Sequence, residues 1–322
     1  MEVVTKKRMQ AFSGRGHPEL AKAVVDHLGM RLGAVDIHEF ANGETYVRFK
    51  ENIRGSDVFL IQTHCAPVNN NIWEQLIMID AAKRASAKRI IAVCPFYGYA
   101  RADRKARSRE AITAKLLADM LTTAGATRVV SVDLHTGQIQ GFFDQPLDHL
   151  TALPLLVNWL DERYPDEELV IASPDAGGVK LASKYQSRMP NSRLAFLAKI
   201  REAHNVARTL AVVGEVAGKT CVLVDDMIDT AGTICGAAEV LMERGAQRVV
   251  ACATHPVLSP PACDRLLESP IEKVVVTNTL PIPPDCQIDM IEVVSVAPIV
   301  ASTMKAIFED ESVSELFDDQ NQ

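Results

Sequence analysis

The sequence alternates short β-branched apolar runs with longer segments of helical period. These runs include VFLIQTH, RIIAVCPF, RVVSVDLH, LVIASPD, CVLVDD and RVVACATHP. A strand that is apolar at every position is covered on both faces, and strands separated by helix-length segments pair in parallel. The sequence therefore predicts an α/β protein built on parallel sheets flanked by helices.

The length of 322 residues is sufficient for two domains that each bury a core. The segments SAKRIIAVCP, GATRVVSVDLH and GAQRVVACATHP share one pattern, in which a helix ends at a small residue and a basic side chain precedes a strand. Repeated αβ units produce this pattern with or without gene duplication. The segment FDQPLDHLTALPLL has no clean period, so we expect a boundary there, between domains 1–150 and 151–322.

Composition and charge exclude several classes of protein. No window contains the apolar run of about 18 residues that a membrane span needs, and a net charge of −7 argues against sequence-independent nucleic-acid binding. The N-terminal residues have no apolar core, so we expect no signal peptide and a cytoplasmic protein. The seven cysteines are odd in number and lack a C-x-x-C pair, so we expect buried free thiols, without disulfides or a zinc site.

One local run is strongly basic. Residues 101–109, RADRKARSR, contain five Arg or Lys residues and one acid. On a chain that is otherwise acidic, we predict that this run binds small anions.

The segment VLVDDMIDTAGT, residues 222–233, lies between an apolar strand and the helical ICGAAEVLMERG. This order places backbone N–H groups at a helix N-terminus, where the hydroxyls of Thr230 and Thr233 add donors. Ala231 and Gly232 are small enough to let an anion approach the backbone. The segment predicts a phosphate site.

The acids of the same segment need a separate explanation, because adjacent aspartates repel and are poor strand formers. Asp225 and Asp226 can accept hydrogen bonds from a ribose diol, with Asp229 at the phosphate end. Helix capping by Asp229 or Thr230 explains one acid only. The segment resembles the phosphoribosyl diphosphate loop of type I phosphoribosyltransferases and ribose-phosphate pyrophosphokinases.

Other motifs resemble the second of these families. VDLHTGQIQGFFDQPLDHL is similar to its divalent-cation signature, and FANGETYVRF, YGYARADRKARSREAITAKL, SPDAGGV and ATHPVLS follow the family's order. The resemblance implies two type I phosphoribosyltransferase-like domains, with the ATP side in the first and the ribose 5-phosphate loop in the second. It also implies transfer of the diphosphoryl group of ATP, the co-substrate, to ribose 5-phosphate with Mg²⁺, for nucleotide biosynthesis.

The resemblance further implies that His135 and Asp175 are metal residues. From the residues alone, a satisfied polar histidine at a strand end is the more common explanation for His135, and a turn aspartate explains Asp175. Lys199 and Arg201 match two cations that stabilise the transition state, with Arg201 also binding substrate. Here Lys199 to Glu202 read KIRE where the family has Lys-Arg-Arg-Pro, and a basic pair on a solvated helix is the alternative.

The nucleotide contacts are expected in FANGE. Phe40, Asn42 and Glu44 alternate, so on an extended segment they share one face, where a ring stacks on adenine and polar groups bond its edge. A hairpin turn at Asn42 and Gly43 explains the same letters. The family usually has Asp at Asn42 and Gln at Ala102. The expected ATP contacts are Phe40, Asn42, Gly43, Glu44, Arg101 and Ala102.

Two alternatives stay open. A phosphoribosyltransferase needs one copy of the fold, and the ATP-type motifs would then have no purpose. A noncatalytic regulatory subunit of a synthase assembly fits Asn42, Ala102 and Ile200 but not the intact DDMIDTAGT. The resemblance also implies a homo-oligomer, commonly a hexamer, with phosphate or ADP as regulators. No nucleic-acid or membrane partner is expected.

Overall fold

The computed structural model describes residues 7–200 and 209–317 of the chain, with the side chains of residues 199, 200, 209, 210, 316 and 317 left aside. The chain divides into two compact units. Unit 1 has the described parts of Met1–Thr151 and Val296–Gln322 together with Thr279–Pro281. Unit 2 has the described part of Ala152–Asn278 together with Ile282–Ser295.

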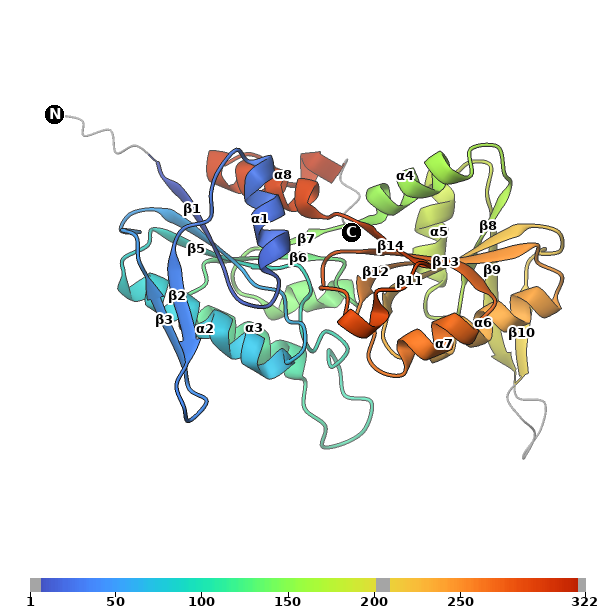
Figure 1. Cartoon of the computed structure of the whole chain (residues 1–322), viewed down its shortest axis with the longest axis horizontal. Helices are drawn as coiled ribbons and strands as arrows, with labels where there is room; N and C mark the ends of the chain where they lie inside the picture. The colour runs from blue at the N-terminus through green and yellow to red at the C-terminus, as the bar shows by residue number, and fades with distance from the viewer. Residues whose placement is uncertain (1–6, 201–208, 318–322) are drawn as a thin grey trace. The chain divides into compact units, whose positions relative to one another are not determined.

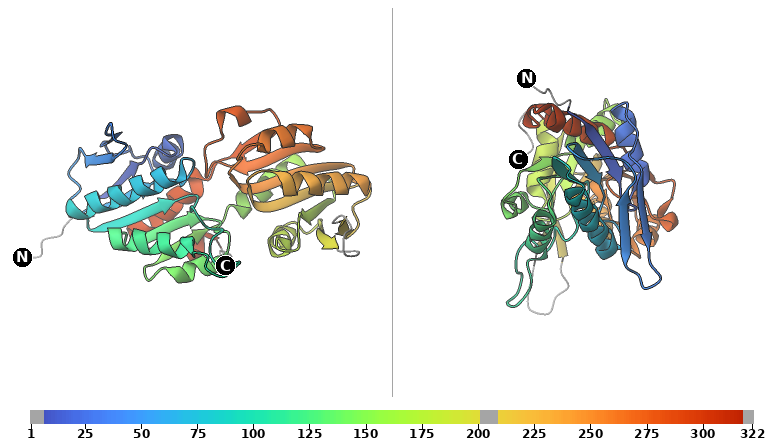
Figure 2. Two further views of the ribbon diagram at one scale, coloured as in Figure 1. Left: turned by 90° about the horizontal axis from the view of Figure 1, so that it is seen from below. Right: turned by 90° about the vertical axis from the view of Figure 1, so that its left-hand side faces the viewer.

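Unit 1 contains a five-stranded parallel sheet in the order β1-β4-β5-β6-β7. Its strands are β1 (Met9–Ser13), β4 (Asp57–Ile61), β5 (Arg89–Cys94), β6 (Arg128–Val132) and β7 (Leu147–Leu150). Its helices are α1 (Pro18–His27), α2 (Val68–Arg84), α3 (Thr113–Ala124), α8 (Ala297–Glu309) and the 3-10 helices η1 (Gly137–Phe142) and η3 (Ser314–Phe317). A separate antiparallel hairpin, β2 (Val35–Glu39) and β3 (Thr45–Phe49), extends away from this sheet (Figure 2, right).

The strands of unit 1 are apolar throughout because both faces of the sheet are covered. Figure 1 shows α1 and α8 on one face and α2 and α3 on the other. Within β4, Val58 and Leu60 belong to the cluster beneath α2 and α3, whereas Phe59 and Ile61 alternate with them and are also buried. This alternation explains the continuous apolar run that predicted a covered parallel strand.

Unit 2 contains a seven-stranded sheet in the order β10-β9-β8-β11-β12-β13-β14. Its strands are β8 (Leu169–Ser173), β9 (Arg193–Ile200), β10 (Thr209–Val213), β11 (Thr220–Ile228), β12 (Arg248–Pro256), β13 (Ile271–Thr277) and β14 (Ile291–Val294). All neighbours pair in parallel except β10, which is antiparallel to β9. Its helices are α4 (Leu153–Arg163), α5 (Val179–Arg188), α6 (Gly232–Glu243), α7 (Ala262–Glu268) and the 3-10 helix η2 (Pro284–Cys286).

The sheet of unit 2 is also buried on both faces, between α4 and α5 on one side and α6 and α7 on the other (Figure 1). In β11, Cys221 and Leu223 belong to the core beneath α6 and α7, whereas Val222 and Val224 belong to the core beneath α4 and α5. The expected α/β class, with two parallel-sheet bodies flanked by helices, is confirmed.

The division of the chain differs from the expected ranges 1–150 and 151–322 at its C-terminal end. The first change of unit falls at Thr151, close to the expected boundary. The chain then returns to unit 1, where α8 packs against α1. A helical sequence pattern marks α8 as amphipathic, but it does not say which sheet the helix covers.

The prediction that all cysteines are free is wrong for one pair. Cys263 in α7 and Cys286 in η2 form a disulfide, with their Cα atoms 5.5 Å apart. The other five cysteines are free and buried, as predicted. Four of these free cysteines lie inside a strand or helix, and burial is the largest cause of the raised pKa of each thiol. They are Cys94, Cys221, Cys235 and Cys252.

Candidate active site

The candidate phosphate site is the junction of β11 and α6 in unit 2. β11 is longer than the sequence predicts, because it continues through both aspartates to Ile228. It pairs with β12 as far as Ile228, whereas its pairing with β8 ends at Leu223. The part of β11 that carries Asp225 and Asp226 therefore extends past the end of β8, at the carboxyl edge where α/β proteins bind ligands.

α6 begins directly after Ala231 and has no side-chain cap. Ala231 is buried and has a left-handed φ of 59°, a conformation that costs a non-glycine residue about 1 kcal/mol. The N-cap position is Ala231, which makes no side-chain cap hydrogen bond, so neither Asp229 nor Thr230 occupies the N-cap position. The N–H groups of this turn and the helix dipole suit an anion.

Three carboxylates interact close to this turn. Burial raises the pKa of Asp225, and the neighbouring charges of Asp226 and Asp175 raise it further. The backbone N–H of Asp226 donates to Asp225 Oδ1 at 2.9 Å. Carboxylates that repel one another are stabilised by hydroxyl donors or by a hard cation such as Mg²⁺.

Asp175 lies in the loop between β8 and α5. Its Oδ1 accepts hydrogen bonds from the backbone N–H of Gly177 at 2.8 Å and of Gly178 at 3.0 Å, and Ser173 Oγ donates to its carbonyl at 2.6 Å. The turn role is therefore present. Oδ2 makes no hydrogen bond to any described residue, so a metal role is compatible with the turn role.

His135 lies in unit 1, in the loop between β6 and η1. It does not end the strand as expected, because β6 stops at Val132 and Asp133 turns the chain with a φ of 35°. His135 and Asp175 belong to different units, and each is described within its own unit. Among the described residues, no group of three or more His, Cys, Asp or Glu side chains has a geometry that could hold a metal ion alone.

Asp103 is a buried acid that sequence reasoning missed. Its Oδ2 accepts from Thr136 Oγ1 at 2.7 Å and from Gln138 Nε2 at 2.6 Å, so it joins the basic run to the loop that carries His135. Only 6% of Asp103 is exposed, although it lies among cations that are all exposed. A single acid inside a basic run was the signal available in the sequence.

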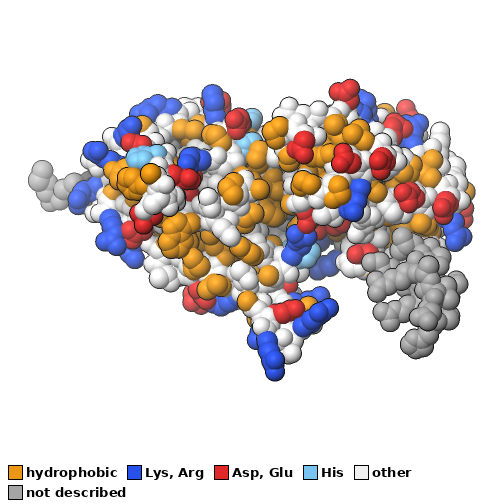
Figure 3. Space-filling model, turned by 60° about the horizontal axis from the view of Figure 1, so that its bottom comes forward, with side chains coloured by type: hydrophobic (Ala, Val, Ile, Leu, Met, Phe, Trp, Pro, Cys, Tyr) orange, Lys and Arg blue, Asp and Glu red, His pale blue; other side chains and the backbone are white. Residues whose placement is uncertain are grey.

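The basic run itself forms an exposed loop between β5 and α3. Lys and Arg side chains gather on it where it projects from the surface (Figure 3). Glu110 Oε2 accepts from the backbone N–H groups of Ala106 and Arg107, both at 2.8 Å, and thereby closes the loop. Ala102 is half-buried, and its N–H donates to Tyr99 O at 2.8 Å.

The FANGE segment is the turn of the β2–β3 hairpin, so the expected extended face is wrong. The N–H of Gly43 donates to Phe40 O, the N–H of Phe40 donates to Glu44 O, both at 2.8 Å, and Gly43 has a φ of 87°. Asn42 Oδ1 accepts from Glu44 N at 3.2 Å, which explains the turn chemistry of Asn-Gly. The Phe40 ring is 50% exposed and remains suited to stacking.

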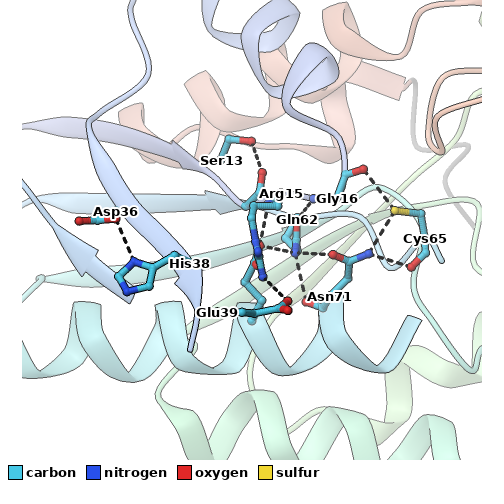
Figure 4. A network of polar contacts seen from close by, with 11 residues as sticks. Ser13, Arg15, Gly16, Asp36, His38, Glu39, Gln62, Cys65 and Asn71 are labelled. Carbon is cyan, nitrogen blue, oxygen red and sulfur yellow. Dashed lines mark hydrogen bonds and ion pairs between the residues drawn. The ribbon is translucent and has the colours of Figure 1, made fainter. Parts of the chain in front are cut away.

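A polar network at the base of this hairpin was also missed (Figure 4). Arg15 donates from Nε to Oε2 of the buried Glu74 at 2.6 Å and from Nη2 to Glu39 Oε1 at 2.9 Å. Glu39 ends β2, one residue before Phe40. Gln62 Nε2 also donates to Glu74 Oε1, at 2.9 Å. The network therefore fixes the position from which the exposed Phe40 ring extends.

Of the two expected catalytic cations, Lys199 lies near the end of β9. The backbone of Lys199 is paired with Leu210 on β10, so this position is extended rather than helical. Arg201 lies outside the described residues.

Comparison with known proteins bears on both units. The model of the N-terminal domain of ribose phosphate pyrophosphokinase matches residues 9–125, and that of the phosphoribosyl synthetase-associated domain matches residues 180–318. A ribose-phosphate pyrophosphokinase of Mycobacterium leprae is 53% identical over 97% of this chain and 96% of its own length. One of Streptomyces avermitilis is 52% identical over 98% of both.

A solved structure gives the same result. The crystal structure of phosphoribosylpyrophosphate synthetase from Mycobacterium smegmatis is 52% identical, with a TM-score of 0.90 over 94% of this chain and 99% of that chain. No helix among the described residues is long and apolar enough to cross a membrane. The matches to both units, at this identity and coverage, show that the chain belongs to the ribose-phosphate pyrophosphokinase family of enzymes.

Proposed function

We propose that this chain transfers the β,γ-diphosphoryl group of ATP to the anomeric hydroxyl of ribose 5-phosphate, giving 5-phosphoribosyl 1-diphosphate and AMP. The observation that carries the proposal is the uncapped N-terminus of α6 directly after a strand that ends in paired carboxylates. This arrangement suits a ligand with a phosphate at one end and a diol at the other. A phosphoribosyltransferase shares such a site, but full-length matches to the two-unit synthases argue against that alternative.

The 5-phosphate of the sugar binds at the first turn of α6. Backbone N–H groups of residues 231–233 and the hydroxyls of Thr230 and Thr233 donate to it. Asp229, in the same loop, is assigned to the substrate site as an acceptor for sugar hydroxyls. Asp225 and Asp226 accept from the ribose hydroxyls. Because these hydroxyls and the carboxylates satisfy each other, binding offsets the repulsion that raises the pKa of Asp225 in the free chain.

Mg²⁺ is the metal that suits the acids of unit 2. The free Oδ2 of Asp175 and the crowded carboxylate of Asp225 are hard oxygen donors. When bound, Mg²⁺ would offset the negative charge of the diphosphoryl group. Asp175 would hold the ion in unit 2, and the family resemblance assigns a metal role to His135 within unit 1.

ATP binds through unit 1. The exposed Phe40 ring stacks on adenine, and Asn42, Gly43 and Glu44 supply polar contacts from the hairpin turn. Arg101 contacts the phosphates beside Ala102. Lys199 and Arg201 offset charge as the anomeric oxygen attacks the β-phosphorus, and the extended backbone at Lys199 supports this assignment.

The wider setting follows from the family. We propose a homo-oligomer, a hexamer by resemblance, in the cytoplasm. The exposed basic loop of residues 101–109 fits regulation by inorganic phosphate or ADP, since Arg104, Lys105 and Arg107 are exposed cations close together in the chain. A noncatalytic subunit remains the alternative that a turnover assay decides.

Analogues of the sugar test the proposed site. We expect calorimetric titration with Mg²⁺ present to show binding of ribose 5-phosphate, weaker binding of 2-deoxyribose 5-phosphate and weaker binding still of ribose. The first analogue loses a hydroxyl to the carboxylates, and the second loses the phosphate. AMP formation with ATP should follow the same order. Equal binding of all three sugars would contradict the assignment of both ends of the site.

A further inference from the structure

Arg265 of α7 is the charged side chain that contacts the backbone of the candidate phosphate loop. Its Nη1 donates to the carbonyl oxygen of Thr230 at 2.8 Å. Arg265 has no ion pair with any described residue. The hydrogen bond to Thr230 is therefore the specific contact that orients this guanidinium.

The contact fixes a peptide plane that the phosphate site uses. In a trans peptide the N–H of Ala231 points opposite to the carbonyl of Thr230. Ala231 has a left-handed φ of 59°, a sparsely populated conformation that persists only when its surroundings hold it. By holding the Thr230 carbonyl, Arg265 also fixes the direction of the Ala231 N–H, which lies in the same peptide plane, points the opposite way and directly precedes the first turn of α6.

The guanidinium lies in an electrostatically unfavourable position. A Cβ atom added at Gly232 would lie 3.2 Å from Arg265 Nη1 and 3.8 Å from its Cζ, so the cation lies at the N-terminus of α6. A cation is unfavourable there because the helix dipole places positive charge at that end. A phosphate bound at the same turn would make this position of the cation favourable, because the guanidinium would then lie close to a negative charge.

α7 holds Arg265 firmly against α6. Leu266 is fully buried in the core that α6 and α7 share, and Cys235 Sγ of α6 donates to Arg265 O at 3.5 Å. Two residues earlier, Cys263 is tied to Cys286 by the disulfide. The base of the arginine is therefore fixed on two sides.

We infer that Arg265 is a positioning residue for the 5-phosphate of the sugar, acting through the Thr230–Ala231 peptide. This inference rests on the proposed function. It assigns to α7 a part in sugar affinity, whereas ATP affinity does not depend on it.

The test compares Arg265→Met, which keeps the aliphatic stem without a donor, with Arg265→Lys, which keeps a cationic donor. We expect Arg265→Met to raise the KM for ribose 5-phosphate about tenfold, the effect of one lost charge-assisted hydrogen bond. The KM for ATP and the melting temperature should stay unchanged, and Arg265→Lys should recover part of the affinity. Arg244→Met, an exposed arginine at the other end of α6, is the matched control and should behave as wild type.

Calorimetric titration of ribose 5-phosphate without ATP gives a second readout, with the same expected ranking. If wild type forms AMP and the KM for ribose 5-phosphate is the same in Arg265→Met and wild type, the inference is overturned. A parallel loss of both affinities with a lower melting temperature would also overturn it, because it indicates a purely structural role. A wild type that forms no AMP would contradict the proposed function instead.

Discussion

The stability of unit 1 should depend on pH through His64, which is fully buried after β4. The N–H of Gly98 donates to His64 Nδ1 at 2.9 Å, so Nδ1 is the acceptor and Nε2 carries the proton toward Gln75 Oε1, 2.8 Å away. Both ring nitrogens are satisfied only in the neutral form. Burial lowers the pKa of His64 to about 4, although the bond to Gln75 opposes the shift.

The magnitude follows from linkage. In the unfolded chain the pKa is about 6.5, so below that pH the unfolded state takes up a proton that the folded state refuses until about pH 4. The free energy of unfolding therefore falls as pH falls through this window. A shift of about 2.5 units at about 1.4 kcal/mol per unit gives a full loss of about 3.5 kcal/mol from this one residue, of which about 3 kcal/mol is reached by pH 4.

The assay is denaturant unfolding at a series of pH values between 4 and 7.5, for wild type and His64→Gln. Trp73 lies in unit 1 and Trp159 in unit 2, so a Trp159→Phe background restricts the fluorescence signal to unit 1. Between pH 6.5 and 4, we expect the unfolding free energy of His64→Gln to fall by about 3 kcal/mol less than that of wild type. This difference does not depend on the stability of the variant at pH 7. His27→Gln, at an exposed histidine, is the control and should follow wild type. Parallel curves for all three proteins would refute the reasoning.

Three further substitutions test the site. Asp225→Asn should raise the KM for ribose 5-phosphate about 10- to 100-fold, more than that for ATP, through lost hydrogen bonds of about 1 to 3 kcal/mol. The raised pKa of Asp225 should make the melting temperature of wild type fall as pH rises, and Asp225→Asn should remove this contribution. Thermal scans over a pH series, with and without sugar, would measure it. Lys199→Ala should reduce kcat by about three orders of magnitude with little change in either KM, and near-full turnover would remove Lys199 from the catalytic role. Asp103→Ala should lower the free energy of unfolding by about 1 to 3 kcal/mol, since Thr136 and Gln138 lose their acceptor, whereas an unchanged denaturation midpoint would show that both find another.

The fold was predictable because nearly every side chain of the central strands is buried, which leaves a continuous apolar run in the sequence. A strand such as β4 or β11 packs alternate side chains into two different cores, and only a sheet covered on both faces gives such uninterrupted apolar runs. The return of α8 to unit 1 was not predictable, because its apolar stripe would suit either sheet. The Cys263–Cys286 pair has no local signature either, since 23 positions separate its members.

The candidate site was predictable where a motif combines residue types with flanking elements. The strand, acids, small residues and helix of residues 222–233 lie where the sequence placed them, except that β11 extends through the acids. FANGE was predicted less well, because alternation along a chain has meaning only if the backbone is extended, and Gly43 closes a turn instead. Asp103, Glu74 and Arg265 act through partners distant in sequence, so tertiary contacts alone identify them.

The central claim is that a diphosphoryl group moves intact from ATP to the sugar. ATP labelled separately at its α-, β- or γ-phosphorus, incubated with the chain, ribose 5-phosphate and Mg²⁺, tests it directly when the products are separated. We predict that the β and γ labels appear together in 5-phosphoribosyl 1-diphosphate and that the α label stays in AMP. Transfer of the γ label alone, with ADP as the second product, or the absence of any labelled sugar from wild-type protein, would contradict the account.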